Sequence, residues 1–577
     1  MHFVIEVDDL SFYARLNVPA PTLCPDCRHA RRLAMRNERT FYKRACNSCK
    51  KSLIAYYPQE KPQVVWCPEC WWSDKLDPFQ YGKDFDFSRP FFEQFKEMYV
   101  KVPTLSLDVV NCHDSEYVSY CGDDKRCYLD IAGEANMDCY YTKFVKYSTN
   151  CVDCSFLYNS ELAYECVNCH RVNNCSFLNR CLDCHNVHLS YDCRGCTDCF
   201  GCWNLRNKQY HIFNQPYSRE DYKKKIAELK RNSYATLELL KKEFARESQK
   251  ALVRFAQLTN CTKCTGDVQE QSKNVKESFD ITKSEDSKWL CDVLDAKDCY
   301  DLDFSLYKPE QSIELISTLN MTYSGFCNAS HFCNHTWYSD KCNNSSNLFG
   351  CIAVNKKQYC ILNKQYTRES FDKLRTRIIE QMKRAGEWGE YFPVGTSGFG
   401  YNETVAQEYF PLTEQQTKSK GFPWWDKPPG TRGKETLKPY QIPDTIEEVQ
   451  DSLTKEILVC VCGRNYRIVG YELALYRKMG IPIPRECPEC RHLNRNKIAG
   501  ERHLWKRRCC CNGETSSKGQ ASREKESETI HGPWPVYQNT TSHFHGKNPC
   551  PNEFETSYSP ERKELIYCEQ CYNAEII

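Results

Sequence analysis

The stretch CSFLNRCLDCHNVHLSYDCRGCTDCFGC, residues 175–202, spaces its cysteines by multiples of three. All fifteen cysteines from Cys112 to Cys202 keep this phase, and the other positions of the row between 139 and 205 are small or apolar. An α-helix repeats every 3.6 residues and a strand every two, so neither produces this row. A solenoid of short straight segments and corners does, as hexapeptide β-helices illustrate. We therefore expect a solenoid-like arm with an inward-facing ladder of small, polarizable side chains.

A second arm repeats the pattern farther along the chain. FGCWNLRNKQYHIFNQPYSRE at 200–220 matches FGCIAVNKKQYCILNKQYTRE at 349–369 in eleven of 21 positions, and a charged helical pattern follows each stretch. We expect two duplicated arms, each with a capping helix, whose cysteines pack. Metal or cluster binding is the alternative, less favoured because a continuous ladder lacks the closed groups of four that zinc prefers. His211 stands where Cys360 stands, which fits both interpretations. One phase is shared by Cys261, Cys264, Cys291, Cys327, Cys333, Cys342, Cys351 and Cys360, with Cys299 as the single exception.

The two ends of the chain carry a duplicated module. Residues 3–49 align without a gap with residues 466–512 at a shift of 463, and both copies place Cys-Pro-x-Cys-Arg-His after Pro-x-Pro. A close cysteine pair on a tight turn directs both thiolates at one ion, and a second pair across a short hairpin completes a tetrahedron. Two zinc ribbons are therefore predicted, the first from Cys46, Cys49, Cys67 and Cys70, the second from Cys460, Cys462, Cys487 and Cys490.

A third ribbon is interrupted near the C-terminus. A shift of 501 aligns Cys49, Cys67 and Cys70 with Cys550, Cys568 and Cys571, so an insertion separates the two parts of this ribbon. Its sequence NGETSSKGQASREKESET is polar and predicts a mobile loop within 512–548. Zinc is expected on Cys568 and Cys571 together with two of Cys509, Cys510, Cys511 and Cys550, and His543 and His545 are less favoured substitutes.

Cys24 and Cys27 form half of a further site. They match Cys487 and Cys490, but the positions that would match Cys460 and Cys462 lie before Met1. Three interpretations remain open: the chain begins inside a longer gene product, the pair takes metal ligands from elsewhere, or it only staples a turn.

Each module continues into a basic segment with seven Lys or Arg and one Glu. Such charge, with Tyr42 or Trp505 beside it, suits phosphate contacts and base stacking, and RNA is favoured over duplex DNA. The competing interpretation is a solvated helix face beside acids of the same chain. The candidate nucleic-acid-binding residues are Arg28, Arg31, Arg32, Arg36, Arg39, Lys43, Arg44, Arg491, Arg495, Lys497, Arg502, Lys506, Arg507 and Arg508.

Four stretches in this order carry a family resemblance: FYARLNVPAPTLCPDCRHARRLAMRNE, WWSDKLDPFQYGKDFDFSRPFFEQF, FGCWNLRNKQY with FNQPYS, and CPNEFETSYSPERKELIYCEQCY. Over nearly its whole length the chain resembles a family of cysteine-rich zinc-ribbon proteins from candidate-phylum bacteria with small genomes. Members usually have a complete CxxC pair before the first aromatic-Ile segment, which this chain lacks. The resemblance implies a fold and bound zinc but no reaction.

The expected fold is mixed and β-rich, with zinc ribbons at both termini flanking two arms. The predicted segments are a ribbon module at 1–75, a connector at 76–108, arms with capping helices at 109–255 and 256–390, an irregular connector at 391–455, and a double ribbon module at 456–577. The opening MHFVIEVDDLSFY is no signal peptide, and no apolar run is long enough to span a membrane, which predicts a reducing cytoplasm.

Three functions compete. The favoured one is a non-catalytic, nucleic-acid-binding protein, RNA above all, that holds two to four Zn²⁺ ions. The alternative is a protein–protein assembly scaffold with structural zinc. The third is an enzyme of unknown reaction with Glu403 and Asp426 in a pocket at 397–430, although no motif names a reaction and no catalytic residue is identified.

Overall fold

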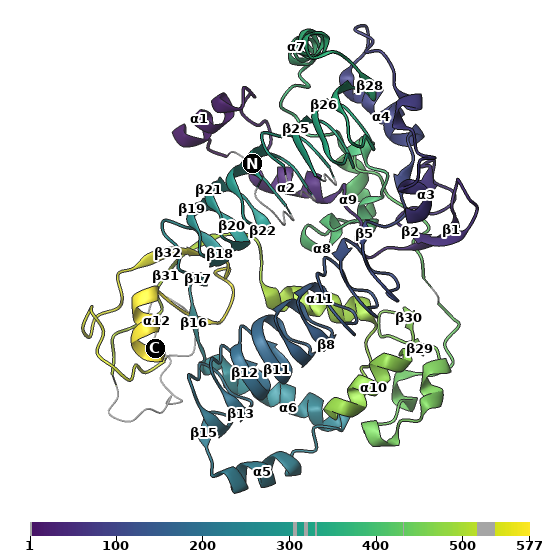
Figure 1. Cartoon of the computed structure of the whole chain (residues 1–577). Coiled ribbons are helices and arrows are strands. Elements are labelled where there is room, and N and C mark those ends of the chain that lie inside the picture. Colours follow the sequence, from purple (N-terminus) through teal and green to yellow (C-terminus); the bar gives the residue numbers. More distant parts are fainter. Residues whose placement is uncertain (1–2, 304–308, 317–320, 329–331, 431, 516–536) are drawn as a thin grey trace. The chain divides into compact units, whose positions relative to one another are not determined.

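The computed structural model describes residues 3–303, 309–316, 321–328, 332–430, 432–515 and 537–577 (Figure 1). The fold is β-rich and mixed, with many small sheets and cysteine clusters near both ends. The chain forms two compact units, each from segments that are not adjacent in sequence. Unit 1 joins the residues up to Leu107 with Ala256–Pro429, and unit 2 joins Asp108–Phe255 with Gly430–Ile577. In each unit a terminal module therefore folds with an arm that is remote in sequence.

The first arm is a ladder of short parallel strands whose register advances by twelve residues at each rung. Cys151 pairs with Ala163, and Ala163 pairs with Cys175. The strands are β5 (Val109–Val110), β6 (Cys121–Gly122), β7 (Lys143–Lys146), β8 (Thr149–Val152), β9 (Ser155–Tyr158), β10 (Glu161–Tyr164), β11 (Val167–Asn179), β12 (Leu182–Tyr191), β13 (Thr197–Phe200) and β14 (Gln209–Ile212), with β15 (Gln215–Pro216) antiparallel to β14.

Corners at every third residue explain the row of cysteines. Asp153, Phe156 and Asn159 have φ of 53°, 54° and 50°, and this left-handed conformation recurs at the same interval along most of the arm. A twelve-residue rung therefore turns at four corners, and the residue after each corner points inward. So tight a rung leaves room only for small side chains, and Cys, Ser, Val and Leu dominate the buried interior.

The buried thiols of the ladder have hydrogen-bond partners. Cys184 Sγ lies 3.4 Å from the carbonyl oxygens of both Leu182 and Cys193, two residues back and nine ahead. Cys121 and Cys175 repeat this pattern. Because buried polar groups are costly without partners, a thiol that is both small and a weak donor suits this interior well.

The second arm is built in the same way, except that two of the rungs differ in length among the pairings of its described residues. Thr262 pairs with Lys273, an advance of eleven residues, and Lys297 pairs with Glu310, an advance of thirteen. The strands are β17 (Leu258–Thr259), β18 (Gly266–Glu270), β19 (Lys273–Lys276), β20 (Ser278–Thr282), β21 (Glu285–Lys288), β22 (Cys291–Leu294), β23 (Lys297–Tyr300), β24 (Glu310–Ile313), β25 (Cys333–Trp337), β26 (Ser345–Phe349) and β27 (Gln358–Ile361), with β28 (Lys364–Gln365) antiparallel to β27.

These two rungs correct the expected phase of the second arm. After the short rung the interior row moves to Val275, Leu290 and Cys299, and after the long rung it returns to the phase of Cys327. Cys299, predicted as the exception, therefore lies in the interior. Cys291, predicted to lie inside, is buried on the outer side of the ladder, next to Asp303 of the following rung.

Helices follow each arm, as the charged patterns predict. The first arm has two of them, α5 (Arg219–Glu228) and α6 (Tyr234–Glu247), and the second has the single α7 (Arg368–Ala385). Tyr222 of α5 and Leu240 of α6 pack with Phe200 and Ile212 of the last strands. Ser218, Ser233 and Thr367 cap these helices by accepting a backbone N–H at the N-terminus.

The elements of the two terminal modules correspond in order and in position at the sequence shifts of 463 and 501. The N-terminal elements are α1 (Val7–Arg15), α2 (Pro25–Leu33), β1 (Tyr42–Ala45), β2 (Ser52–Ala55), β3 (Val65–Trp66) and α3 (Pro68–Trp71), followed by α4 (Phe91–Lys101) and β4 (Thr104–Leu105). Their C-terminal counterparts are α10 (Gly470–Met479), α11 (Pro488–Ala499), β31 (Trp505–Arg508), β32 (Glu553–Thr556), β33 (Leu565–Tyr567) and α12 (Glu569–Ile576). The remaining α-helices and strands are α8 (Ala406–Tyr409), α9 (Glu414–Ser419), β16 (Leu252–Arg254), β29 (Leu458–Val459) and β30 (Asn465–Tyr466).

Candidate metal centres and the buried arginine clusters

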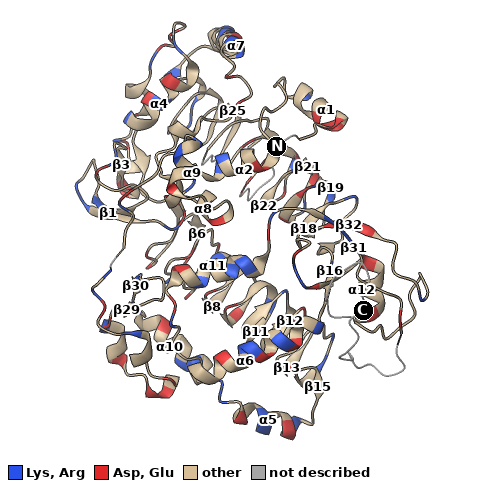
Figure 2. Cartoon of the chain, turned by 180° about the vertical axis from the view of Figure 1, so that it is seen from behind, with Lys and Arg blue, Asp and Glu red and all other residues tan. Residues whose placement is uncertain are grey.

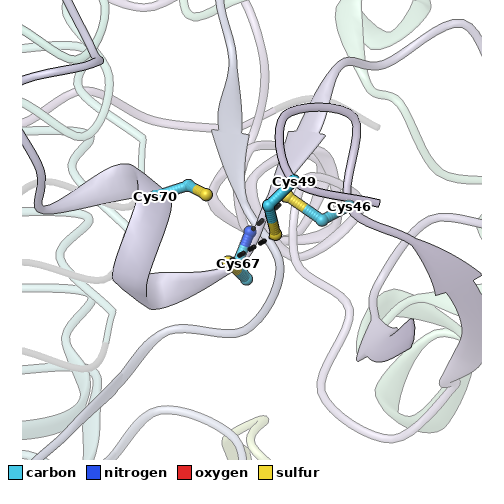
Figure 3. A group of neighbouring side chains, drawn as sticks. All are labelled: Cys46, Cys49, Cys67 and Cys70. Atoms are coloured by element: carbon cyan, nitrogen blue, oxygen red, sulfur yellow. Dashed lines mark hydrogen bonds between the residues drawn. The ribbon is translucent and has the colours of Figure 1, made fainter. Parts of the chain in front are cut away.

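The Cys46 group consists of Cys46, Cys49, Cys67 and Cys70, whose sulfurs converge (Figure 3). The turn after β1 positions the first pair, while Cys67 is the N-cap of α3 and Cys70 lies within that helix. Cys49 Sγ is 3.7 Å from Cys67 Sγ, and the Cys67 N–H donates to Cys46 Sγ at 3.3 Å. Sulfurs bound to one tetrahedral zinc at about 2.3 Å lie roughly 3.8 Å apart, so this spacing fits one ion.

The thiols of this group are prepared unequally for deprotonation. Burial raises the pKa of Cys46, but the N–H groups of Cys49, Cys67 and Ser48 outweigh it and lower the pKa to about 7. Burial raises the pKa of Cys67 well above its ordinary value. A bound metal ion removes this difference, because a coordinating thiol is deprotonated outright.

The Cys460 group consists of Cys460, Cys462, Cys487 and Cys490. The turn between β29 and β30 carries the first two, and Cys487 caps α11 in the way that Cys67 caps α3. The sulfurs of Cys460 and Cys490 are 3.7 Å apart, and those of Cys462 and Cys487 are also 3.7 Å apart. This group fits a single tetrahedral ion as well.

The Cys509 group contains two cysteines that lie together with Cys568 and Cys571. Cys509 and Cys550 complete this buried set of four, with Cys571 Sγ at 3.7 Å from Cys550 Sγ. Cys511 lies instead with His543, His545 and Cys571, while Cys510 is half-buried beside them. Of the loop expected to be mobile, residues 516–536 lie outside the described part of the chain. Of the residues that follow them, Asn539, His543 and His545 lie near Cys511.

Cys24 and Cys27 lie at the start of α2, where Cys24 is the N-cap and Cys27 is exposed. Burial, together with the neighbouring thiol of Cys24, raises the pKa of Cys27. A metal role for this pair stays a prediction. All forty cysteines are free thiols, and those of the arms are mostly buried, as expected.

The arginines of the N-terminal basic segment are buried against acids of the second arm. Arg28 Nε lies 2.9 Å from Asp301 Oδ2, and Arg32 Nε lies 2.5 Å from Asp303 Oδ2, with both guanidinium groups inaccessible to solvent. Arg31 follows the same rule and pairs with Glu314 at 3.0 Å. The carboxylates raise the pKa of all three arginines despite their burial. These pairs attach α2 to the ladder.

Unit 2 repeats the arrangement with α11 and the first arm. Arg491 pairs with Asp153 and lies 3.6 Å from the buried Glu472, and Arg495 Nη1 lies 2.7 Å from Asp153 Oδ1. Arg495 also donates to the Tyr141 carbonyl oxygen at 2.9 Å. Figure 2 shows blue Lys and Arg positions on the ribbon of α11. Lys497 of this helix is exposed.

This placement corrects the predicted phosphate contacts. Seven of the fourteen candidate residues are buried, so they cannot reach a nucleic acid without leaving their partners. Arg36 pairs with Glu38 at 2.7 Å, and Arg44 donates to the Pro58 carbonyl oxygen at 3.1 Å. The buried residues are Arg28, Arg31, Arg32, Arg36, Arg44, Arg491 and Arg495; Arg39, Arg502 and Arg507 are half-buried; and Lys43, Lys497, Lys506 and Arg508 are exposed.

The acids considered for catalysis have different surroundings. Glu403 is buried, accepts from the Gly400 N–H at 2.6 Å and pairs with Lys61 at 2.5 Å, so its contacts hold the surrounding loop together. Asp426 is exposed. Neither placement supports a proton-transfer role for these carboxylates.

A further buried group, which the sequence analysis missed, contains His29, Cys291 and Asp303. Their potential ligand atoms lie within 4.8 Å of one another. However, the Arg32 guanidinium already neutralises Asp303, and its charge repels a cation. We assign no metal to this trio.

Comparison with known proteins identifies no family. No family model and no curated protein matches the chain. A solved structure from Desulfovibrio desulfuricans G20, provisionally described as an acetyltransferase, aligns with 49% of this chain and 79% of its own, at 8% identity and a TM-score of 0.10. That likeness is too weak to carry an argument. Within the described ranges, no helix is both long and apolar enough to cross a membrane.

Proposed function

We propose that this protein is a non-catalytic assembly scaffold, built from two solenoids of mostly twelve-residue rungs, each attached to a zinc-ribbon module. The single observation that carries the proposal is that arginines of α2 and α11 form buried ion pairs with acids of the arms. These arginines, which the sequence analysis assigned to a polyanion, therefore attach each ribbon module to its arm.

Zinc is the metal that the cysteine groups favour. Four thiolates in a tetrahedron are typical of structural zinc, and the 3.7 Å sulfur separations suit the Zn–S bond length. Such sites contribute about 10 kcal/mol or more to the folding of small zinc modules. We infer at least three structural ions per chain, and reduced thiols suit the cytoplasm.

Nucleic-acid binding is the second candidate, and one observation favours it. Lys43 on β1 and Lys506 on β31 occupy equivalent positions of the duplicated module, and both are exposed. Equivalent cations on two hairpins suit two phosphate contacts. The charge is nevertheless small, because a single-stranded contact contributes only about 0.7 to the slope of log K against log salt.

The discriminating experiment measures binding of the full chain to single-stranded RNA over a salt series. The scaffold proposal predicts that Lys43→Glu/Lys506→Glu behaves as wild type, and that complexes isolated from the protein's own cells keep their size after nuclease treatment. The matched control, Lys373→Glu/Lys418→Glu, reverses two exposed lysines far from the ribbons in sequence. The proposal fails if nuclease dissolves the complexes, or if the ribbon variant alone loses about 1.4 units of salt slope.

A further inference from the structure

We propose that the C-terminal cysteine cluster holds two metal ions, with the thiolate of Cys571 bridging them. The inference rests on the proposed metal binding and adds a site to it. Cys571 belongs both to the Cys509 group and to a second set of Cys511, His543 and His545. The cluster is carried by β31, β32 and α12, together with residues 537–548 that return from the insertion (Figure 1).

The second set has the composition of a closed structural site. Cys511 and Cys571 are buried, the His543 side chain is inaccessible to solvent, and all the potential ligand atoms lie within 4.8 Å of one another. Two sulfurs and two imidazole nitrogens form one of the tetrahedral ligand sets that zinc takes in structural sites.

Hydrogen bonds orient both imidazoles for metal binding. The Asn548 carbonyl oxygen is 2.6 Å from His545 Nδ1 and only accepts, so Nδ1 carries the proton and Nε2 presents a lone pair. That Nε2 lies 3.3 Å from Cys571 Sγ. In His543 the roles are reversed: Nε2 lies 2.9 Å from Glu575 Oε1, and Nδ1 is buried without a hydrogen-bond partner. A carboxylate behind a histidine is the usual support of a metal ligand.

Further hydrogen bonds fix Glu575 and Cys511 at this site. Glu575 also accepts the Thr540 N–H at 3.0 Å, which holds the carboxylate behind His543. Asn539 Nδ2 donates to Cys511 Sγ at 3.3 Å, and the Tyr567 hydroxyl donates to Asn539 Oδ1 at 3.0 Å. Such donors to sulfur are typical supports of a thiolate ligand.

The ends of the insertion are held close together near the site. Gly513 has φ of 76°, and a Cβ at this position would lie 2.5 Å from the Gly546 carbonyl oxygen and 2.6 Å from that of Asn548. Only glycine fits such an approach. The close approach at Gly513 therefore brings the backbone on either side of the insertion together, and with it His545 and Cys511.

Charge balance favours the second ion. Four thiolates around one dication leave a formal charge of −2, and Cys511 as a thiolate would add another negative charge to this buried region. Two dications with five thiolates and two neutral imidazoles leave −1. A second cation therefore lowers the uncompensated buried charge, and it gives His543 Nδ1 the partner that it lacks.

The N-terminal copy of the module provides an internal comparison. At the shift of 463, Cys511 corresponds to Ser48, and the insertion that supplies His543 and His545 is absent between Ser48 and Cys49. The Cys46 group therefore has ligands for one ion only. The insertion and the Ser-to-Cys difference occur together in the copy that we assign two ions.

Metal quantification on the full chain tests the second ion. We expect four zinc ions per chain in wild type, and three in His543→Ala/His545→Ala or in Cys511→Ser. Cys510→Ser is the matched control, since Cys510 adjoins the ligands without belonging to either set, and it should keep all four. Three ions in wild type and an unchanged content in the histidine variant would overturn the proposal, whereas no bound zinc in wild type would refute the proposed metal binding itself.

A measurement on the unmodified chain tests the bridge. After replacement of zinc by cadmium-113, two resonances should show mutual cadmium–cadmium scalar coupling, because only ions that share a thiolate are joined through bonds. Signals from the Cys46 and Cys460 groups should be uncoupled. Four uncoupled signals would show two separate ions and remove Cys571 as the bridge. This readout does not depend on any variant folding.

Discussion

Asp153→Asn removes the carboxylate that pairs with two buried arginines. Asp153, Arg491 and Arg495 are all nearly inaccessible to solvent, so the substitution leaves two buried guanidinium groups without the carboxylate that both contact. Losing one partner of a buried ion pair costs about 3–5 kcal/mol. The backbone should not change, because Asp153 is at a left-handed corner with φ of 53° and asparagine tolerates this conformation.

The matched control is Asp183→Asn in the same arm. Asp183 is also at a left-handed corner, with φ of 54°, but it pairs with Arg171 where both side chains are about half exposed. Such a surface pair contributes about 0–1 kcal/mol. Hydrogen exchange of the full chain, read at α11, should show a loss of protection for Asp153→Asn and none for Asp183→Asn. Equal protection in both variants would refute the role assigned to these arginines.

Three further predictions concern the ladder and the metal. Burial raises the pKa of Asp124 to about 6, so the folded state holds this proton more tightly than the unfolded state. The stability that the protonated Asp124 contributes is full below about pH 4 and is lost as the pH rises through 6. In urea unfolding, the free energy of unfolding of Asp124→Asn should rise by about 3 kcal/mol relative to that of wild type when the pH is raised from 4 to 8. Cys175→Ala should cost about 1.5 kcal/mol or less, whereas Cys175→Asp should unfold the first arm, as measured by circular dichroism. Removing zinc with a chelator should expose the modules around Cys46 and Cys460 to limited proteolysis while the ladders persist.

The sequence predicts the ladder because inward residues are visible as a row. Cysteines spaced by multiples of three predict that the corners are three residues apart, but this spacing does not predict how many residues make up a rung. The rungs of eleven and thirteen residues shift the phase, which is why Cys291 and Cys299 exchange the roles predicted for them. Only the pairing register reveals such a change, because either residue is a plausible interior side chain.

The metal groups are predictable to the extent that their ligands are close in sequence. Paired cysteines identify the Cys46 and Cys460 groups, whereas the choice among Cys509, Cys510 and Cys511 depends on which way each side chain points. The burial of the arginines could not be predicted, because their acidic partners are remote in sequence. Arg28 is 273 residues from Asp301, so its charge looks unpaired until the fold brings the two together.

The buried ion pairs also specify which arm each module joins. In unit 1, α2 presents Arg28, Arg31 and Arg32 to three acids of the second arm. In unit 2 the residue that corresponds to Arg31 is Asn494, which has no charge. Arg32 donates its Nε–H to Asp303, whereas the corresponding Arg495 donates its Nε–H to the uncharged Ser155. A module on the wrong arm would therefore bury a charge without its partner, at a cost of several kcal/mol. Duplicated modules and duplicated arms can thus share one chain, because the number of buried charges differs between the two pairs and only the native combination balances them.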